Sequence, residues 1–363
     1  MESLDVRQFD DIYEGRRVLL TGHTGFKGSW LAQWLVQLGA TLTGFALAPA
    51  TTPSHWQLLD LPATDLRGDV RDLPALDAAL AQSQPEIVFH LAAQPLVRRS
   101  YRDPLESWST NVMGTANVLE ACRRHRCVRA VVVVTTDKVY ANQEWAWGYR
   151  ESDRLGGHDP YSASKAAAEL VAASYRQGFF SQDGAPLLAT ARAGNVLGGG
   201  DWSEDRLIPD LVRASSRGET LEIRSPHATR PWQHVLDCLA GYLLLGQRLL
   251  EGDHSCAAAW NFGPAAQDNR SVEAVLAQMQ GHWPALAWRV SDAPQPHEAK
   301  LLYLDSSLAR SRLGWQPAWN LGQALAATAA WYREQADGGA PTRRQLDAYI
   351  ADAAAAGVNW VAA

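Results

Sequence analysis

The chain has 363 residues, of which 47% are hydrophobic and 20% charged, and its formal net charge is −6. The length suggests about two domains of roughly 150 residues each, with an ordinary globular composition. The mild acidity excludes a broad basic surface, so nucleic acid is not an expected partner. Because no apolar run reaches the ~18 residues of a membrane-spanning helix, we also expect no membrane association.

The first residues and the cysteines indicate the compartment. Residues 1–5 are Met-Glu-Ser-Leu-Asp and lack the basic-then-apolar pattern of a signal peptide. The four cysteines form no CxxC pair, and their spacing does not fit a structural zinc site. We therefore expect reduced thiols, no bound metal and a cytoplasmic protein.

Short apolar strands alternate with helices through the first half of the chain. Continuous apolar strands of this kind are typical of a parallel sheet covered by helices on both faces. We therefore predict a Rossmann-like, doubly wound α/β domain. Its expected strands are residues 17–21, 41–46, 65–68, 87–91, 130–136 and 187–193, and its expected helices are a segment ending at Gly39 and residues 77–82, 104–125 and 161–178.

The pattern after Asn195 is mixed and less regular. Helices are expected at residues 207–217, 235–250, 272–280 and 321–334, with an extended segment at 221–223 and a strand returning to the first domain at 260–263. We predict a larger domain of residues 15–194, completed by about 235–264. The remaining residues, 195–234 and 265–363, are expected to form a smaller mixed α/β lobe that binds the substrate.

A glycine-rich turn, Gly22-His23-Thr24-Gly25-Phe26-Lys27-Gly28, connects the first strand to the first helix. Its spacing differs from the ordinary G-x-G-x-x-G, but its position between strand and helix is the one that binds a dinucleotide. The first glycine permits a tight turn, the second lets the backbone approach a pyrophosphate, and the third lets helix and strand pack closely. The motif predicts a dinucleotide site that includes Thr24, Phe26 and Lys27.

The acidic residue expected about 20 residues later, where it would hold the adenosine ribose, is missing. The second strand ends Gly44-Phe45-Ala46-Leu47-Ala48. We therefore expect loose cofactor binding, with Lys27 and the loop after Ala48 as alternative anchors. Asp69 is either a turn residue or a partner of the adenine amino group, with Val70 beside it.

The fourth strand ends in His90-Leu91-Ala92-Ala93-Gln94, where Leu91, Ala92 and Ala93 leave room for the cofactor backbone. In the long helix that follows, Asn111 either faces the sheet and fixes a neighbouring loop or is a surface amide.

Two further groups of residues carry proton-transfer chemistry. Tyr161 and Lys165 are four residues apart, so the phenol and the ammonium share one face of a helix. A phenol titrates near pH ~10, and a nearby cation favours its anion, which makes Tyr161 a candidate base. Thr136-Asp137-Lys138 ends a strongly apolar strand and offers a second acid/base pair. Few enzymes need both sets, and those that do oxidise, rearrange and then reduce a substrate.

Together these motifs resemble the extended short-chain dehydrogenase/reductase family. Within it, Thr136-Asp137-Lys138-Val139-Tyr140 is similar to the sugar-nucleotide 4,6-dehydratases. Further marks of this branch are the segments Gly25–Trp30, Arg192–Val196, Gly199–Trp202 and Arg230–Val235. Lys138 resembles the branch that acts on CDP-glucose, since the dTDP-glucose branch usually has glutamate there. Asp137 and Lys138 read as a surface turn only if these neighbouring motifs are ignored.

The resemblance implies a lyase that converts CDP-glucose to its 4-keto-6-deoxy product with NAD, in deoxysugar biosynthesis. Tyr161 would take the proton of the glucose 4-hydroxyl, and Lys165 would hold the nicotinamide ribose. Thr136 would form a hydrogen bond with the 4-oxygen of the glucose. Asp137 would protonate the leaving C6 hydroxyl, which requires a pKa above the ordinary ~3.9. Lys138 would remove the C5 proton, which requires a pKa below ~10.4, or would stabilise the enolate while another group acts.

A substrate with a diphosphate needs cationic and amide donors. The candidates are Gln94, Asn195, Arg206, Arg230 and, in a loop that could close on the nucleotide, His297. Four of the fifteen tryptophans lie in expected loops, where they form either a substrate wall or ordinary packing: Trp145, Trp147, Trp202 and Trp232. Arg98 and Arg99 are equally compatible with surface charge.

Two other functions are compatible with parts of this pattern. A sugar-nucleotide 4-epimerase would share Tyr161 and Lys165 but would not need Asp137 and Lys138. A regulator that binds NAD without catalysis would need neither pair. The family resemblance also implies a homodimer, or a dimer of dimers, formed through helices 104–125 and 161–178.

Overall fold

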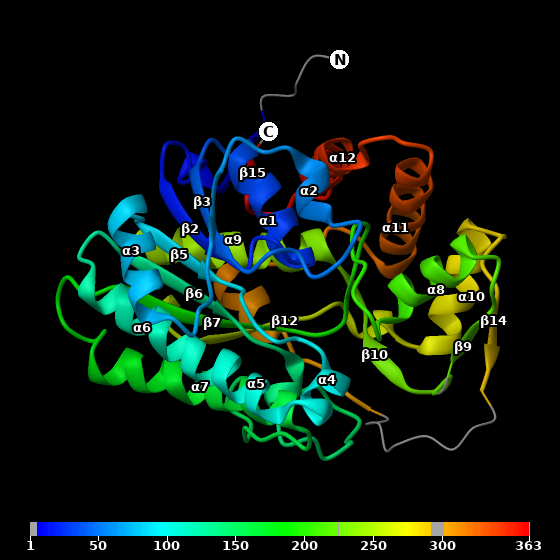
Figure 1. The fold of residues 1–363 in the computed structure, drawn as a ribbon, viewed down its shortest axis with the longest axis horizontal. Helices are drawn as coiled ribbons and strands as arrows, with labels where there is room; N and C mark the ends of the chain where they lie inside the picture. Colours follow the sequence, from blue (N-terminus) through cyan, green and yellow to red (C-terminus); the bar gives the residue numbers. More distant parts are fainter. Residues whose placement is uncertain (1–5, 224, 292–300, 363) are drawn as a thin grey trace.

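A seven-stranded parallel sheet forms the centre of the larger domain (Figure 1). The computed structural model describes residues 6–223, 225–291 and 301–362. In sheet order the strands are β12 (Ala259–Phe262), β7 (Leu187–Ala193), β6 (Ala130–Val134), β5 (Ile87–His90), β2 (Arg17–Thr21), β3 (Thr41–Ala46) and β4 (Thr64–Arg67). The predicted parallel sheet is confirmed, and β12 is the expected returning strand, paired with β7.

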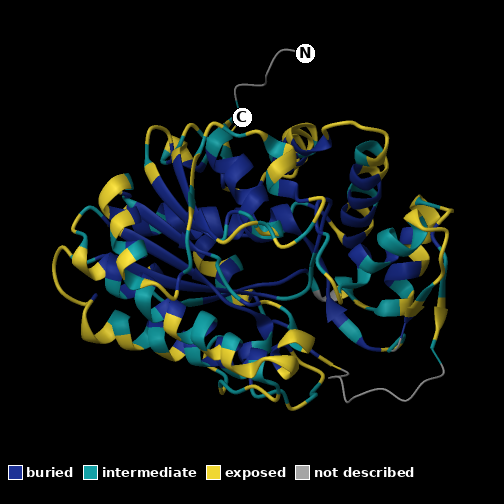
Figure 2. Cartoon of the chain, viewed as in Figure 1, coloured by how far each residue is buried: buried dark blue, intermediate teal, exposed yellow. Residues whose placement is uncertain are grey.

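Successive residues of one strand enter two different apolar cores. On β2, Val18 and Leu20 belong to one core, whereas Leu19 belongs to the other. On β6, Val132 and Val131 are divided in the same way. Both faces of the sheet are therefore buried (Figure 2), which explains why its strands are continuous apolar runs.

Helices cover the two faces of the sheet. α1 (Phe26–Gln37) and α9 (Val235–Leu250) pack in one core, and α3 (Leu73–Ser83), α6 (Gly114–Arg124) and α7 (Pro160–Gly178) pack in the other. The predicted helix 104–125 is present but not uniform. It consists of α5 (Pro104–Trp108), a π-helical turn (Ser109–Met113) and α6. Such π turns re-aim side chains and often occur at functional sites.

The smaller lobe is built from short elements and lies beside one end of the sheet (Figure 1). Its helices are α8 (Leu207–Ser216), α10 (Val272–His282) and α11 (Leu321–Ala336). Its strands form three pairs: β9 (Leu221–Ile223) with β14 (Trp288–Val290), β10 (Thr229–Pro231) with β13 (Asn269–Ser271), and β8 (Val196–Leu197) with β11 (Gln233–His234). Shorter elements of the larger domain include α2 (His55–Leu59) and α4 (Val97–Arg102).

The end of the chain returns to the larger domain. β15 (Val361–Ala362) pairs with β1 (Arg7–Gln8), and α12 (Pro341–Ala355) packs on α1, where the Tyr349 and Trp34 ring centroids are 5.7 Å apart. Residues 341–362, which the sequence assigned to the lobe, therefore pack against the larger domain, although α12 also contacts α11 through Thr342 and Trp331. The alanine-rich sequence of α12 has a weak amphipathic pattern, so the helix was not predicted.

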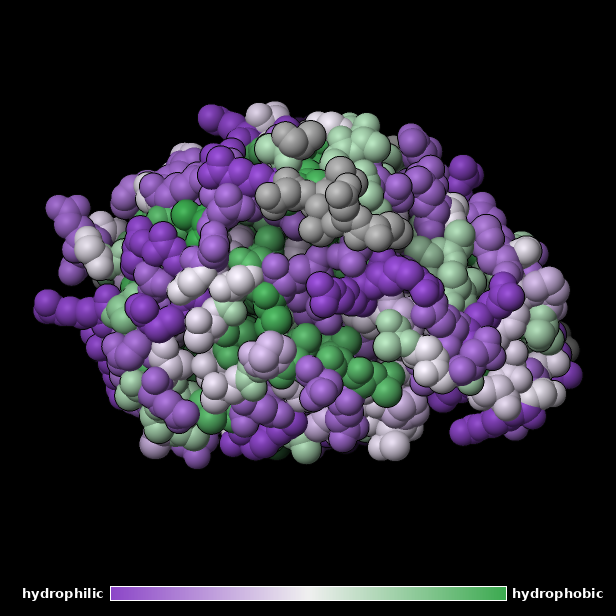
Figure 3. All heavy atoms as spheres, turned by 90° about the horizontal axis from the view of Figure 1, so that it is seen from above, coloured by the Kyte–Doolittle hydropathy of each residue, from purple (hydrophilic) through white to green (hydrophobic). Residues whose placement is uncertain are grey.

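Across the described ranges, no helix is both long and apolar enough to cross a membrane. In the same ranges, no three His, Cys, Asp or Glu side chains gather as a metal ion requires. The four cysteines are free. The face seen in Figure 3 is largely hydrophilic, with apolar residues gathered near its middle.

Asp237, at the start of α9, connects this helix to the C-terminal segment. Its Oδ1 accepts hydrogen bonds from the backbone N–H of Ala318 (2.7 Å) and from the hydroxyl of Tyr349 (2.9 Å). The side chain is fully buried, and this burial raises the pKa of Asp237 to about 7.

We predict that Asp237 makes the fold less stable as pH rises. Its folded pKa lies above the ~3.9 of an unfolded aspartate, so the stability that it contributes when protonated is lost as pH rises through about 7. Asp237→Asn stays uncharged, so its Tm relative to wild type should increase from roughly pH 4 to pH 7 and level off above that in thermal melts. Asp337→Asn, at the exposed end of α11, is the control. A pH-independent difference for Asp237→Asn would contradict the prediction.

Candidate active site

The turn after β2 brings three backbone segments into close contact. A Cβ at Gly22, where φ is +79°, would lie 2.6 Å from the backbone nitrogen of Ala92, and one at Gly28 would lie 2.1 Å from the carbonyl oxygen of Gly22. Gly25 is the N-cap of α1, which no side chain of the described residues caps. The first N–H groups of α1 are therefore available to an anion.

This turn lies between β2 and β5, where the strand order of the sheet reverses. Open α/β sheets bind nucleotides at this kind of switch point. Half-buried Leu91, Ala92 and Ala93 follow β5 beside the turn, so they lie where the sequence predicted space for a cofactor. The residues present therefore fit a dinucleotide.

Thr24 and Lys27 have different surroundings. The hydroxyl of Thr24 donates to the carbonyl oxygen of Leu47 (3.1 Å), which ties the glycine turn to the end of β3. Lys27 points toward α9 instead, with its Nζ 3.3 Å from the hydroxyl of Tyr242 and 3.8 Å from Sγ of Cys238. This position does not support Lys27 as an anchor for the adenosine end of a cofactor. Phe26 begins α1 and packs at the edge of the main core.

Sequence reasoning missed His23, which is buried within the glycine turn. A Cβ at Gly44 would lie 2.4 Å from the His23 ring, so β3 can pass the ring only because it has a glycine there. The Nε2 of His23 is 2.9 Å from Oδ1 of Asp65, whose other oxygen accepts a hydrogen bond from Trp56. The acidic residue on β4 is thus paired within the protein.

Asp69 lies in a tight turn and pairs with Arg71. Side-chain hydrogen bonds from Arg71 lower the pKa of Asp69, and the backbone N–H of Arg71 also donates to it (2.9 Å). Neighbouring Val70 is buried against Gly114 of α6. This geometry accounts for Asp69 as a turn residue, and its contact with adenine stays a prediction.

Asn111 is buried in the π-helical turn and fixes a neighbouring loop, as one of the two alternatives predicted. Its Oδ1 accepts the backbone N–H of Gln94 (2.9 Å), and its Nδ2 donates to Oγ of Ser164 on α7 (2.9 Å). The Gln94 side chain donates to Ser107 and accepts from the N–H of Leu96. Because the protein already occupies these atoms, the structure favours Gln94 as a loop anchor over a substrate contact.

The candidate acid/base segment follows β6 at the carboxyl edge of the sheet. Thr136 is the N-cap of a single 3₁₀ turn, Asp137–Val139, and its Oγ1 accepts the N–H of Lys138 (3.3 Å) and donates to Oδ1 of Asp137 (2.9 Å). Asp137 is buried, and within the described residues its Oδ2 has no hydrogen-bond partner. This oxygen faces Gly194, where a Cβ would lie 3.2 Å away. Lys138 is half-buried.

Tyr161 and Lys165 lie one turn apart near the start of α7, as predicted, and both are buried. Asp159 caps this helix by accepting the N–H of Ser162, which places Tyr161 in its first turn. The ammonium of Lys165 donates to the carbonyl oxygen of Val134 (3.1 Å), the last residue of β6. The structure therefore brings the two predicted proton-transfer groups together.

Burial controls the protonation of both groups. Burial raises the pKa of Tyr161 to about 12, although a hydrogen bond with Thr136 and the charge of Arg206 oppose this. The sequence had suggested that a nearby cation favours the phenolate, but in the protein desolvation outweighs the charge of Arg206. Burial and then the charge of Lys27 lower the pKa of Lys165 to about 8, against the carboxylate of Glu169.

Among the predicted substrate residues, Arg206 has a charge that acts on Tyr161, and its Nη1 is 3.9 Å from Oδ2 of Asp201. Arg230 is buried on β10, where its Nη1 donates to the carbonyl oxygen of Thr229. Half-buried Asn195 follows β7 and accepts the N–H of Gln233 through its carbonyl. His297 lies outside the described residues.

The four tryptophans form two groups, one packed within the protein and one in a loop. The Trp202 ring packs edge-on against Trp331, and Trp232 is buried with its Nε1–H donating to the backbone carbonyl oxygen of Arg270 (3.0 Å). These contacts favour packing over a substrate wall for both residues. Trp145 and Trp147 stack on each other, and Trp147 is 63% exposed.

Sequence reasoning also missed a buried ion pair beneath the site, between Glu169 of α7 and Arg192 of β7 (2.9 Å). The signal was present, because Glu169 follows Lys165 by one helical turn and Arg192 interrupts an apolar strand. Without the strand order, neither residue could be placed near the other.

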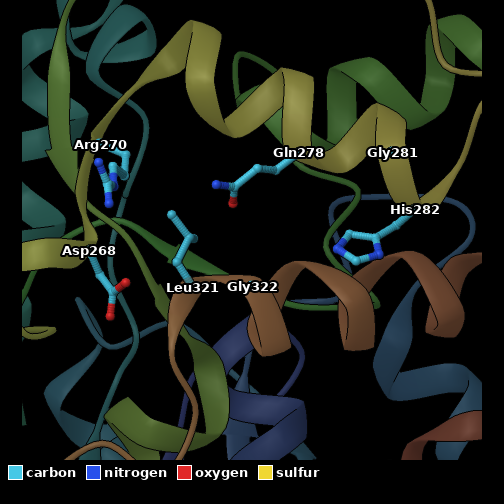
Figure 4. A pocket seen from close by; sticks show the side chains of 7 residues that line it. All are labelled: Asp268, Arg270, Gln278, Gly281, His282, Leu321 and Gly322. Atoms are coloured by element: carbon cyan, nitrogen blue, oxygen red, sulfur yellow. The ribbon is translucent and has the colours of Figure 1, made fainter.

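A hollow of about 410 Å³ lies between α10 and α11 (Figure 4). Its lining includes Arg270, Gln278 and His282, which are exposed. None of the candidate catalytic residues lines it, so it is separate from the active site.

We predict that Gly28→Ala weakens the fold even without a cofactor. The added Cβ would overlap the carbonyl of Gly22, and such overpacking costs about 1–3 kcal/mol. Gly25→Ala is the matched control, because its Cβ would meet the same oxygen at an ordinary 3.4 Å. Urea unfolding of the cofactor-free protein should separate the two variants, and equal stabilities would contradict the close approach.

Comparisons with known proteins agree with this arrangement. The model of the family described as GDP-mannose 4,6 dehydratase matches residues 19–328. The chain is 46% identical to a CDP-glucose 4,6-dehydratase of Salmonella typhimurium over 89% of its length and 92% of that protein, and 30% identical to a dTDP-glucose 4,6-dehydratase of Streptomyces antibioticus over 87% and 92%.

A solved structure of the dTDP-glucose 4,6-dehydratase DesIV from Streptomyces venezuelae, with NAD and TYD bound, superposes with a TM-score of 0.75 at 26% identity. The superposition covers 90% of this chain and 99% of that one. The chain therefore belongs to the GDP-mannose 4,6-dehydratase family of NAD-dependent short-chain dehydrogenases/reductases that act on sugar nucleotides.

Proposed function

We propose that this chain is a CDP-D-glucose 4,6-dehydratase, a hydro-lyase that forms CDP-4-keto-6-deoxy-D-glucose. The observation that carries the proposal is the position of Asp137 and Lys138 on the turn after β6, beside Tyr161 and Lys165. A 4-epimerase would need Tyr161 and Lys165 but not Asp137 and Lys138. Identity of 46% to a CDP-glucose enzyme supports the choice of nucleotide.

NAD supplies the redox chemistry of this family: when bound, it takes a hydride from C4 of the glucose and returns it to C6. Gly22, Gly25 and Gly28, with the N–H groups that begin α1, provide the cradle for its pyrophosphate. The ammonium of Lys165 would hold the nicotinamide ribose.

Tyr161 removes the proton of the glucose 4-hydroxyl during oxidation. Its pKa of about 12 is too high for a free phenolate at neutral pH, so the cationic form of Lys165 is needed to favour the anion. Thr136, which is hydrogen-bonded to Tyr161, positions the 4-oxygen of the glucose. The ketone formed at C4 makes the C5 proton acidic.

Elimination then requires one base and one acid. Lys138 accepts the C5 proton, or stabilises the enolate while another group does so, and Asp137 donates a proton to the C6 hydroxyl, which leaves as water. The unpartnered Oδ2 of Asp137 is the atom available for this transfer. Return of the hydride to C6 and of a proton to C5 completes a turnover with no net oxidation.

Arg206 and Arg230, with Asn195, provide the donors that a diphosphate needs at the junction of domain and lobe. Arg206 is the strongest candidate of these, because its charge already acts on the phenol of Tyr161. A contact from His297 remains a proposal from the sequence.

We also infer that the chain forms homodimers through α5, α6 and α7. Large apolar side chains exposed on α5, on the π turn, on α7 and just after α7 support this interface: Leu105, Trp108, Met113, Leu170 and Phe179. Apolar patches of this kind are typical of protein interfaces.

We predict that the protein converts CDP-glucose faster than dTDP-, UDP- or GDP-linked sugars. The product should have lost one water by mass spectrometry and should absorb in the ultraviolet after alkali, which an epimer does not. Stimulation by added NAD would agree with the loose binding expected from the missing acidic residue on β3. An unchanged mass with an inverted C4 would identify an epimerase instead.

We predict that Asp137→Asn and Lys138→Met stop the reaction after oxidation. Tyr161 and Lys165 are intact in both variants, so bound NADH should accumulate at its near-ultraviolet absorbance while dehydration falls by about 10²-fold or more. Stopped-flow absorbance and product analysis measure the two steps. Dehydration at the wild-type rate by Lys138→Met would show that Lys138 is not the base.

We predict that Leu105→Glu yields monomers. The leucine is 76% exposed in the chain, so the charge costs the monomer little but would be buried in the dimer. Leu58→Glu on α2, which is also exposed but off this face, should remain dimeric in sedimentation velocity. A dimeric Leu105→Glu would place the interface elsewhere.

A further inference from the structure

The buried pair Glu169–Arg192 contacts the residues on both sides of the candidate acid/base segment. Glu169 lies on α7 one turn beyond Lys165, and its Oε1 accepts a hydrogen bond from the hydroxyl of Thr135. Arg192 lies on β7, and its Nη1 donates to the hydroxyl of Tyr140 (2.8 Å). The two residues bond each other through Nη2 and Oε2 (2.9 Å).

These contacts enclose the acid/base segment. Thr135 immediately precedes Thr136, and Tyr140 immediately follows the 3₁₀ turn Asp137–Val139. One end of the segment is therefore held by Glu169 and the other by Arg192. Because Glu169 is also part of α7, the same pair relates the segment to the helix of Tyr161 and Lys165.

The pair is enclosed on every side. Glu169 is 4% exposed and Arg192 3% exposed. The carboxylate also accepts from Thr190 (2.7 Å), and the guanidinium donates to the backbone carbonyl of Glu151 (3.0 Å). A buried, multiply bonded pair of this kind has one geometry, since any displacement leaves a buried charge without its partners.

We propose that Glu169 and Arg192 act as positioning residues for the reaction, aligning the Thr136–Lys138 segment with Tyr161 and Lys165. The proposal rests on the proposed dehydration, because only that reaction needs both groups aligned. Neither residue reaches the substrate; each acts through the groups that it holds.

The charge of Glu169 has a second consequence. Its carboxylate favours the ammonium form of Lys165, whose pKa is lowered to about 8 by burial and by Lys27. Besides Glu169, the charged and titratable groups facing Lys165 are Lys27 on α1 and His90 at the end of β5. Glu169 itself faces Arg192 and Arg176.

The first test compares two threonines that bond the same carboxylate. Thr135→Val removes the hydrogen bond that leads into the acid/base segment, and Thr190→Val removes the one from β7, with no charge stranded in either. The Tm of both variants should fall by a similar amount. Thr135→Val should lower kcat about tenfold with KM within about threefold, and Thr190→Val should lower kcat much less, because small misplacements at a reacting centre are costly. Equal losses of kcat would overturn the proposal.

The second test is the pH profile of Glu169→Gln. Gln keeps the acceptor oxygen but not the charge, so the pKa of Lys165 should fall further, and activity should be lost at a lower pH on the alkaline side. Glu251→Gln, which removes the carboxylate of a surface pair with Arg248, should leave the profile in place. The proposal would be overturned if Glu169→Gln kept the wild-type kcat and lost activity at the same alkaline pH as wild type.

Both tests compare variants with wild type on whichever nucleotide-glucose the wild-type enzyme converts. A wrong choice of CDP therefore leaves them valid. If wild type epimerises instead of dehydrating, the proposed function fails on the wild-type product alone, before any variant is compared.

Discussion

The hydrogen bond from Lys165 to the carbonyl oxygen of Val134 joins the two halves of the active site. The carbonyl belongs to the last residue of a central strand, and the ammonium belongs to the first turns of the helix that covers that strand. Because both partners lie in buried, regular elements, this contact holds Tyr161 next to the Thr136–Lys138 segment. The ion pair of Glu169 and Arg192 fixes the same two elements a few residues away.

The burial that fixes Tyr161 and Lys165 in position also disfavours their charged forms. Removing water makes the neutral forms of both Tyr161 and Lys165 more favourable, so the pKa of the phenol rises and that of the amine falls. The proposed mechanism needs the opposite forms. The charges that counteract burial therefore favour the proposed mechanism: Arg206 acts on Tyr161, and Glu169 acts on Lys165.

The position of the cofactor site depends on backbone contacts and not on side chains. Gly22 and Gly28 approach so closely that a single methyl group would overlap a carbonyl or amide of the neighbouring segment. At the start of α9, Asp237 connects that helix to the C-terminal segment, which packs on α1. The helix α1, whose N-terminus we propose to bind the pyrophosphate, packs against segments from both ends of the chain.

Periodicity and motifs alone predicted the parallel sheet, the glycine turn and the pairing of Tyr161 with Lys165, because these features are local or repeat within one element. They also placed Asp137 and Lys138 at the end of a buried strand. The sequence could not decide whether Asn111 was buried or which way Lys27 points, and it suggested a substrate role for Trp202 and Trp232 that their packing does not favour.

These outcomes depend on which elements become neighbours, and that is decided by long-range packing. In the π turn, Asn111 donates a hydrogen bond to Ser164 of α7. The Lys27 side chain contacts Tyr242 of α9, and Trp202 packs against Trp331 of α11. The same holds for Glu169 and Arg192, which are 23 residues apart in sequence. Sequence by itself determined which chemical groups stand at the carboxyl edge of the sheet. Only the tertiary structure decided how they are held and charged, because burial and pairing arise when distant segments meet.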